Sequence, residues 1–206
     1  MKPFKFLVLI ILLAFGFKAQ AQQPGLHLNL QYSYALPLSN FKSDIISDGS
    51  PRGVTGDLLY GINNKVAVGL GLGFQDFYQK YPRSLYPTGD HETTSAVLSN
   101  SVQIIPVLAK AQFFPLGDKA AIQLYISGGV GLGITSFTQY LGEFGSTDNS
   151  AGLMLQGGAG IKIPFGVMKN AGVSLGANYN MVSYKKNGFN NLNNLNLQAG
   201  VYFPLR

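Results

Sequence analysis

The chain has 206 residues, of which 46% are hydrophobic and only 12% are charged, and its net charge at neutral pH is +6. The charged fraction is about half of that in an average soluble domain. The chain contains no cysteine, which excludes disulfides and thiolate metal ligands. The sequence has no basic stripe, and we expect no nucleic-acid partner.

The N-terminus has the pattern of a signal peptide. Two lysines precede an apolar run from Phe6 to Phe17, and Ala19–Ala21 fits the small-x-small cleavage pattern. The run is too short for a spanning helix, which needs about 20 residues. We predict a cleaved Sec-type signal peptide at residues 1–21 and a single domain at residues 22–206. Because three of the 15 basic residues lie in the signal, the mature net charge is +3. The alternative is a retained N-terminal membrane anchor.

Apolar and polar residues alternate from Leu26 to Leu36, which predicts a β-strand with one apolar and one polar face. The polar face is almost free of charge and carries Asn, Gln and Ser. An apolar outer face with a polar inner face is typical of a barrel whose outside contacts lipid. This alternation recurs in eight predicted strands, approximately Leu26–Leu36, Val54–Tyr60, Val66–Phe77, Val97–Phe114, Ala121–Phe137, Leu153–Pro164, Val173–Tyr184 and Leu195–Phe203.

Pro106, in the fourth predicted strand, predicts a β-bulge, because proline cannot donate a ladder hydrogen bond.

Short and long connections alternate between these strands. An up-and-down outer-membrane barrel has tight periplasmic turns and long external loops. We therefore predict an all-β fold, an eight-stranded antiparallel up-and-down transmembrane β-barrel with a polar lumen, located in the cell outer membrane. The short connections are 61–65, 115–119 and 165–171, and the long ones are 40–53, 78–96, 138–152 and 185–194.

Glycines lie mostly on the inward face of the predicted strands. The lumen of an eight-stranded barrel is just wide enough for side chains. Small residues on one side therefore leave room for large ones, such as Tyr125, Tyr184 and Tyr202. Two glycine-rich stretches, 71–75 and 128–133, resemble phosphate-binding loops. Neither opens a predicted helix or is followed by Gly-Lys-Ser/Thr, which favours the barrel interpretation.

Ionisable residues inside the strands fall on the inward face, where they avoid lipid. His27, Asp57, Lys110 and Lys162 all lie near the periplasmic ends of their strands. We predict a lumenal charge cluster near the periplasmic mouth, in which Asp57 pairs with Lys110 or Lys162 and the network plugs the lumen. The alternative is that each lysine reaches periplasmic water independently, because long side chains extend easily to an interface.

Evidence for catalysis or metal binding is weak, and we expect no catalytic residue, metal or cofactor. No G-x-S-x-G pattern is present. Asp90-His91-Glu92 holds three ligand types, but adjacent residues in one loop are a weak basis for a metal site. On strand one, His27 lies about 20 Å from Ser33, too far for a catalytic pair. A hydrolase site using Ser127 or Ser174 across the barrel stays open.

Aromatic residues at the external strand ends have two interpretations. Their first role is the interfacial girdle of a membrane barrel, where amphipathic rings sit at headgroup level. The alternative is a ligand-binding loop surface, because Tyr and Arg are good anchors. The candidates for this second role are Tyr78, Tyr81, Arg83 and Tyr140.

The stretch Val102–Lys110, with the sequence VQIIPVLAK, resembles the I-P-L-L-L-K-Y strand of the outer-membrane β-barrel domain of Bacteroidetes-type bacteria. A glycine-rich strand follows, as in that family, here from Tyr125 to Gly131. An extra Ile precedes Pro106, and Ala111 stands where Tyr is usual. The family is similar to OmpX- and OmpW-like eight-stranded barrels. Some PorT-like relatives take part in secretion of cell-surface proteins. The resemblance implies an outer-membrane location and no catalytic residues.

Three functions stay open at this point. We expect a non-enzymatic outer-membrane barrel with a structural or surface-interaction role through its external loops. The alternatives are a narrow channel or conduit for small or lipophilic solutes, and a lipid-modifying outer-membrane enzyme. The expected partners are outer-membrane lipid and lipopolysaccharide, the barrel-insertion and periplasmic chaperone machinery, and other surface proteins through the loops. We expect a monomer.

Overall fold

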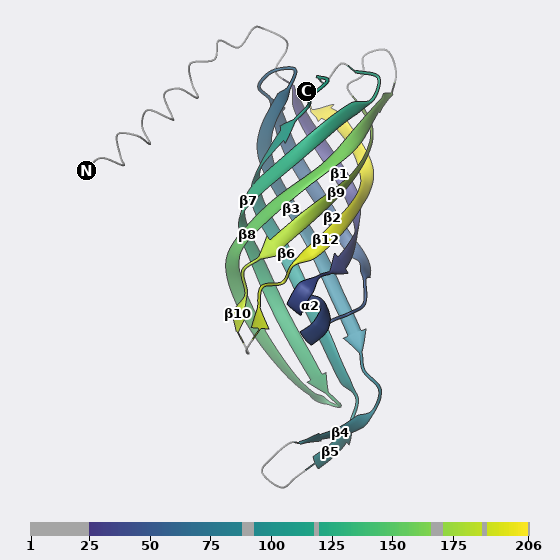
Figure 1. The fold of residues 1–206 in the computed structure, drawn as a ribbon, viewed down its shortest axis with the longest axis vertical. Coiled ribbons are helices and arrows are strands. Elements are labelled where there is room, and N and C mark those ends of the chain that lie inside the picture. The colour runs from purple at the N-terminus through teal and green to yellow at the C-terminus, as the bar shows by residue number, and fades with distance from the viewer. Residues whose placement is uncertain (1–24, 88–92, 118–119, 166–170, 187–188, 206) are drawn as a thin grey trace, which may run out of the picture.

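The computed structural model describes residues 25–87, 93–117, 120–165, 171–186 and 189–205. Eight antiparallel strands form a closed barrel in the order β1-β12-β9-β8-β7-β6-β3-β2 (Figure 1). The predicted up-and-down barrel of eight strands is confirmed. The barrel strands are β1 (Leu26–Pro37), β2 (Ser50–Gly61), β3 (Val66–Lys80), β6 (Leu98–Phe113), β7 (Gln123–Leu141), β8 (Phe144–Phe165), β9 (Ala171–Val182) and β12 (Asn194–Leu205).

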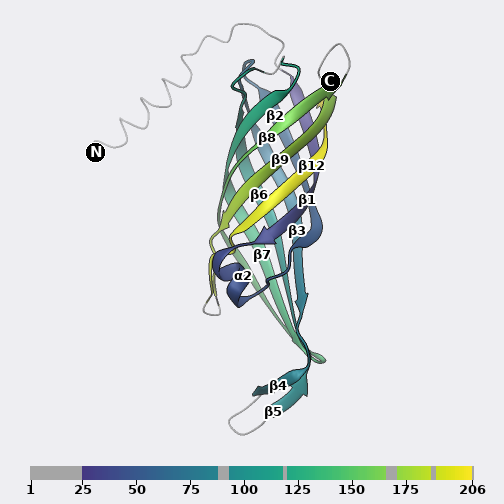
Figure 2. The ribbon, with the colours of Figure 1, turned by 45° about the vertical axis from the view of Figure 1, so that its right-hand side comes forward.

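The remaining elements lie at one end of the barrel (Figures 1 and 2). They are the short helix α2 (Ser39–Asp44) and the hairpins β4 (Ser84–Pro87)–β5 (Thr93–Ala96) and β10 (Lys185–Lys186)–β11 (Phe189–Asn190). We call this the external end. The opposite, periplasmic end holds both ends of the described chain, where Leu26 pairs with Leu205. Among the described residues, no helix is long and apolar enough to cross a membrane.

The cross-strand register fixes the width of the barrel. Followed from Asn29 through β2, β3, β6 and β7, it leads to Met154 on β8. Followed the other way through β12 and β9, it leads to Pro164, so the two paths differ by 10 residues along β8. This offset of 10 residues is the shear of the barrel. Eight strands with this shear tilt by about 40° from the barrel axis and enclose just enough room for side chains.

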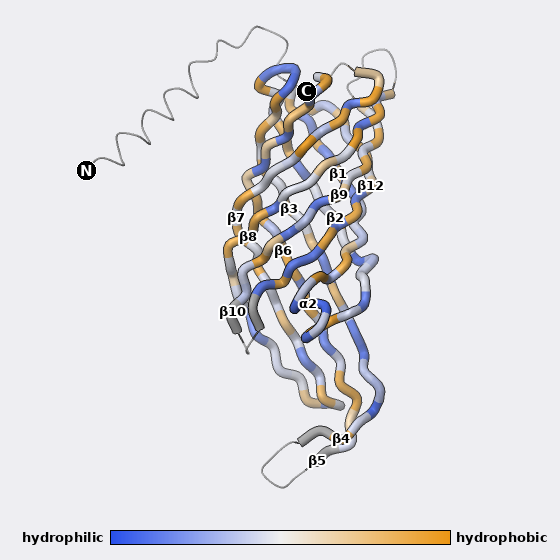
Figure 3. Tube along the Cα trace, in the orientation of Figure 1, coloured by the Kyte–Doolittle hydropathy of each residue, from blue (hydrophilic) through white to orange (hydrophobic). Residues whose placement is uncertain are grey.

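The exposure of the side chains follows the predicted alternation. On β3, Leu70 and Leu72 are 62% and 59% exposed, whereas Gln75 on the other face is buried. On β7, Val130 and Leu132 are exposed, and Tyr125 is buried. Hydrophobic and hydrophilic residues accordingly alternate along the strands in Figure 3. The apolar face is directed outward on the barrel wall, as a lipid environment requires.

The predicted long loop at 138–152 is wrong. β7 extends to Leu141 and β8 begins at Phe144, so only Gly142 and Glu143 form the turn. Gly142 has φ of 63°, a backbone conformation that glycine adopts without strain and that two-residue hairpin turns require. The outward positions at the end of β7, beginning with Ser136, are polar, so this hairpin continues beyond the apolar part of the wall. The other long connections contain α2 and the two small hairpins.

The bulge predicted at Pro106 is also wrong. Leu72 pairs with Val107 and Gln75 with Ile104, so the register between β3 and β6 is the same on both sides of the proline. The missing N–H interrupts the ladder without adding a residue. The register shift lies instead between β1 and β2, at Ser33–Ala35.

An apolar cluster closes the external mouth of the lumen. Phe41 of α2 is fully buried, and its ring meets that of Phe77 on β3 edge to face, with centroids 4.9 Å apart. The Ile45 carbonyl after α2 accepts hydrogen bonds from the Tyr81 hydroxyl at 2.8 Å and the Asn100 amide at 3.0 Å. The lumen is therefore apolar at this end, which the sequence did not predict. We call this cluster the cap; it consists of Ala35, Phe41, Ile45, Ile46, Phe77, Val102, Ile104, Leu108, Phe137, Met154, Val182, Tyr184 and Leu192.

Tyr184 links the cap to the protruding strand β8. Burial raises the pKa of this phenol above its ordinary value, and the negative charge of Asp148 acts in the same direction. The phenol therefore stays neutral at physiological pH, as a buried cap residue requires.

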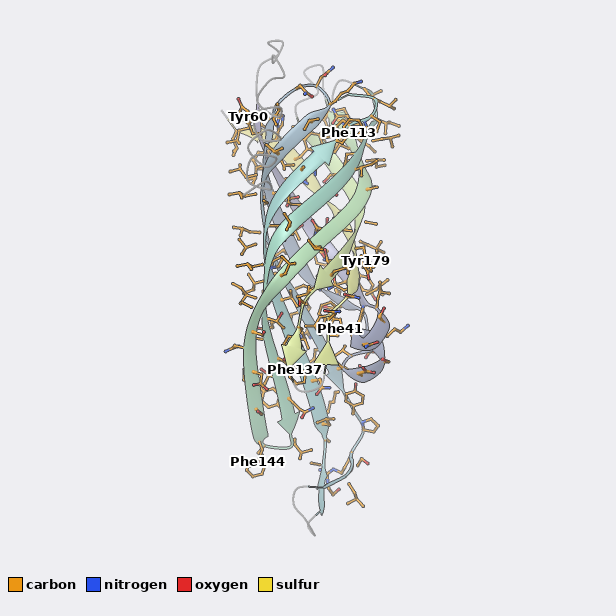
Figure 4. All side chains as sticks on the ribbon, turned by 60° about the vertical axis from the view of Figure 1, so that its left-hand side comes forward. Phe41, Tyr60, Phe113, Phe137, Phe144 and Tyr179 are labelled. Atoms are coloured by element: carbon orange, nitrogen blue, oxygen red, sulfur yellow. The ribbon has the colours of Figure 1, made fainter. Side chains whose placement is uncertain are left out.

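We expect Phe41→Ala to destabilise the protein by about 3–5 kcal/mol, because it empties the centre of the cap. The matched control is Phe144→Ala at the hairpin tip, where the ring is 81% exposed (Figure 4). Urea unfolding of the refolded barrel measures both changes. Equal unfolding free energies for the two variants would show that the cap contributes no stability.

Candidate functional site

A buried ion pair lies in the periplasmic half of the lumen. Lys110 on β6 donates from Nζ to both carboxylate oxygens of Asp57 on β2, at 2.8 and 2.9 Å. The two side chains are only 4% and 3% exposed. β3 lies between β2 and β6, so the two side chains meet across β3 and do not come from directly paired strands. Of the two partners that the sequence allowed for Asp57, the structure selects Lys110.

The second lysine, Lys162, sits among aromatic rings instead of carboxylates. Its Nζ donates to Gln112 Oε1 at 2.9 Å. It also lies 5.1, 5.5 and 5.2 Å from the ring centroids of Phe114, Tyr125 and Tyr202. Ring faces attract a cation, most strongly where water is excluded. This cage lies on the periplasmic side of the lumen and surrounds a buried ammonium that forms no salt bridge with any described carboxylate.

His27 lies at the start of β1 and is half-buried, and its Nδ1 is 3.0 Å from the Gly25 carbonyl. Its cross-strand partner on β2 is Leu59, two residues from Asp57. The structure therefore brings Asp57 and Lys110 together and places Lys162 and His27 at the same end of the lumen.

Neutral polar side chains fill the lumen around the charges. Ser174 donates to Asn29 Oδ1 at 3.0 Å and accepts from Gln31 Nε2 at 3.1 Å. Ser127 donates to Asn178 Oδ1 at 3.1 Å. Both serines that the sequence left open for catalysis are thus hydrogen-bonded to amides. Sequence reasoning missed Gln112 and the aromatic cage, although their inward parity was readable.

Gly71 makes room for the ion pair. A Cβ at this position would lie 2.4 Å from Lys110 Cδ and 2.7 Å from Asp57 Oδ1. Gly160 and Gly176 play the same part for Tyr125, whose hydroxyl would lie 2.4 Å from a Cβ at either site. The expected complementarity of small and large residues is therefore present around Tyr125.

The four external candidates have different surroundings. Tyr78 is 44% exposed and lies under the Arg52 guanidinium, with 5.9 Å from Cζ to the ring centroid. Tyr81 anchors the cap through Ile45, as described above. Tyr140 is 47% exposed and packs beside Gly145 at the hairpin tip. Arg83 is exposed before β4. Their role in ligand binding stays a prediction.

The described residues contain no cluster of three or more potential metal-ligating side chains. The weak candidate Asp90-His91-Glu92 lies outside the described residues, as does the predicted signal peptide. Both stay predictions.

Comparison with known families decides the classification. The family model for the outer membrane protein β-barrel domain matches residues 7–203. The chain belongs to this family. The predicted location in the outer membrane is thereby confirmed. The Bacteroidetes-type branch suggested by the strand around Pro106 stays a prediction.

Solved structures show the same fold at low sequence identity. OprG, an outer membrane protein of Pseudomonas aeruginosa, has a TM-score of 0.55 and 13% identity, covering 92% of this chain and 100% of that chain. Neisserial surface protein A has a TM-score of 0.53 and 16% identity, covering 88% of this chain and 97% of that chain. At such identities the likeness concerns the fold alone. No curated protein matches this family member significantly in sequence.

We expect Gly71→Ala to destabilise the barrel by about 1–3 kcal/mol, because the added methyl group displaces the buried ion pair. Gly128→Ala is the matched control, since a Cβ there meets nothing within 4 Å. Urea unfolding of both variants tests this, and a control that loses as much stability as Gly71→Ala would contradict it.

The cap lies toward the external end of the lumen and the ion pair toward the periplasmic end. Single-channel conductance therefore tests whether each of them is a separate barrier to ion flow. Asp57→Ala alone and Phe41→Ala alone should each leave single-channel conductance in planar bilayers low, because one barrier remains. The double variant should conduct several-fold more than either. A double variant that conducts no more than the parent would show that the ion pair is not a plug.

Proposed function

We propose that this outer-membrane barrel is a non-enzymatic surface-interaction protein that binds extended segments of other surface proteins along the external part of β8. The observation that carries the proposal is the external part of β8, which extends beyond the pairing of β8 with β9. β8 pairs with β7 along its length to Phe144, but its pairing with β9 begins only at Met154. Among the described residues, no strand pairs with the other edge of β8 from Phe144 to Gly152.

The composition of this edge suits strand addition. Natural proteins protect open edges with lysine, proline or bulges. The segment Phe144–Gly152 has no lysine or proline, and Asp148 is its one charged residue. Its register with β7 continues without a shift. A partner strand would gain main-chain hydrogen bonds along it, with little selectivity required from side chains.

The location of the edge supports an external role. The outward positions of β8 change from Leu155 and Leu153 to Asn149 and Thr147 toward the tip. The polar part therefore stands outside the apolar band of the wall, where a partner can approach from water. Two features count against a conduit, because the buried side chains of the cap and of the ion pair occupy the lumen.

Binding of extended peptides tests the proposal. Nine-residue peptides selected on the wild-type barrel from a random displayed library should protect the backbone amides of 144–152 from hydrogen exchange. Thr147→Lys with Asn149→Lys should weaken the selected peptides by about tenfold, equivalent to 1.4 kcal/mol. The matched control is Ser136→Lys with Thr138→Lys, which adds the same charges to β7, a strand paired along both edges. Peptides that protect another segment instead, or an equal loss in the control, would contradict the proposal.

A further inference from the structure

We propose that the lipid-facing surface at the external ends of β2 and β3 binds the phosphorylated headgroup of an outer-leaflet glycolipid. Arg52 and Lys80 supply the positive charge, and Tyr78 supplies an aromatic face. This site is independent of the β8 edge, which lies on another part of the barrel and would take a peptide.

The height of the site follows from the outward face of β3. The outward residues Leu70, Leu72 and Phe74 are apolar and exposed. The next outward positions toward the external end are Asp76, Tyr78 and Lys80. This change from aliphatic to aromatic and charged residues marks the level where lipid headgroups begin.

Arg52 occupies the same level on the neighbouring strand. It pairs across the sheet with Asp76, and the lipid-facing Val54 is the next outward residue toward the barrel centre. A charge on this face would be costly at mid-depth but is tolerated near the interface. Arg52 is thus placed where the protein surface meets the headgroups of the external leaflet.

The contacts of Arg52 orient its guanidinium without covering it. Its Nη1 is 3.3 Å from Asp76 Oδ2, and Asp76 also accepts from the Ser101 hydroxyl at 3.4 Å. The Arg52 side chain is 62% exposed, whereas that of Asp76 is only 15% exposed. An approaching anion therefore meets the guanidinium and the Tyr78 ring rather than the carboxylate. Planar guanidinium groups match phosphate geometry with two parallel hydrogen bonds.

Lys80 extends the positive charge along the same face. It lies four residues beyond Asp76 on β3, or about 13 Å along the strand. β2 has no residue beside it, and the side chain is exposed. Two separated cations with a tyrosine between them fit a headgroup that carries both phosphate and sugar, because phosphate binds the cations and a sugar ring packs on the aromatic face. An uncharged lipid would use neither cation.

Lipid binding to the folded, full-length mature barrel tests the site. The probes are diphosphorylated lipid A and the same lipid with both phosphates removed, titrated into detergent-solubilised barrel and measured by native mass spectrometry. We expect the wild type to prefer the phosphorylated probe. The double variant Arg52→Gln, Lys80→Gln should weaken that binding roughly twentyfold, because each basic residue near a lipid surface contributes severalfold to affinity.

The single variant Lys80→Gln has a matched control in Lys65→Gln, which removes an exposed lysine from the periplasmic turn between β2 and β3. Lys80→Gln should weaken binding about fivefold, and Lys65→Gln should leave it unchanged. Lys80→Gln also keeps the test valid if loss of Arg52 prevents folding, because Lys80 is exposed and holds no described contact together. Equal binding of the two lipids by the wild type, or an equal effect of the two lysine variants, would overturn the proposal.

Discussion

The closed backbone ladder is the constraint on which the rest of this structure depends. In a lipid environment no water satisfies the amide groups of a sheet edge, so the wall must close on itself. Closing eight strands with a shear of 10 residues fixes a narrow interior. Every inward side chain must then fit opposite another. Glycine occupies positions where a large or charged side chain passes over a neighbouring strand. Gly71 makes room for the ion pair in this way, and Gly160 makes room for Tyr125.

The interior stabilises its two buried lysine charges in different ways. Asp57 and Lys110 compensate each other directly, and a buried pair of this kind is costly to break rather than strongly stabilising overall. Lys162 is compensated by ring faces and one amide oxygen. The charges stay on the periplasmic side, while the external side is closed by aliphatic and aromatic packing around Phe41. The lumen therefore changes from polar to apolar along its axis.

The sequence predicts the wall better than the ends. Strand number, direction and facing follow from a period of two, which is why Leu70 and Gln75 are on the predicted faces and why Asp57 and Lys110 could be proposed as partners. The cap was missed because Phe41 in a short helix and Ile45 and Ile46 just after it form no periodic pattern. The β7–β8 hairpin was taken for a loop because its polar residues beyond Ser136 have no apolar face to alternate with. Arg52 escaped notice because its role depends on the cross-strand neighbour Asp76 and on its height in the wall.

The unequal height of the wall gives the barrel a direction in the plane of the membrane. Four neighbouring strands, β3, β6, β7 and β8, extend further toward the external end than β9, β12, β1 and β2, which end near α2 (Figure 2). A molecule that approaches the side of the shorter strands meets the exposed face of α2, and one that approaches the side of the longer strands meets the β7–β8 hairpin. Rotation of the barrel about the membrane normal therefore decides which face it turns to its neighbours. In a crowded membrane, an encounter between the barrel and a neighbouring protein therefore depends on this rotation angle as well as on the distance between them.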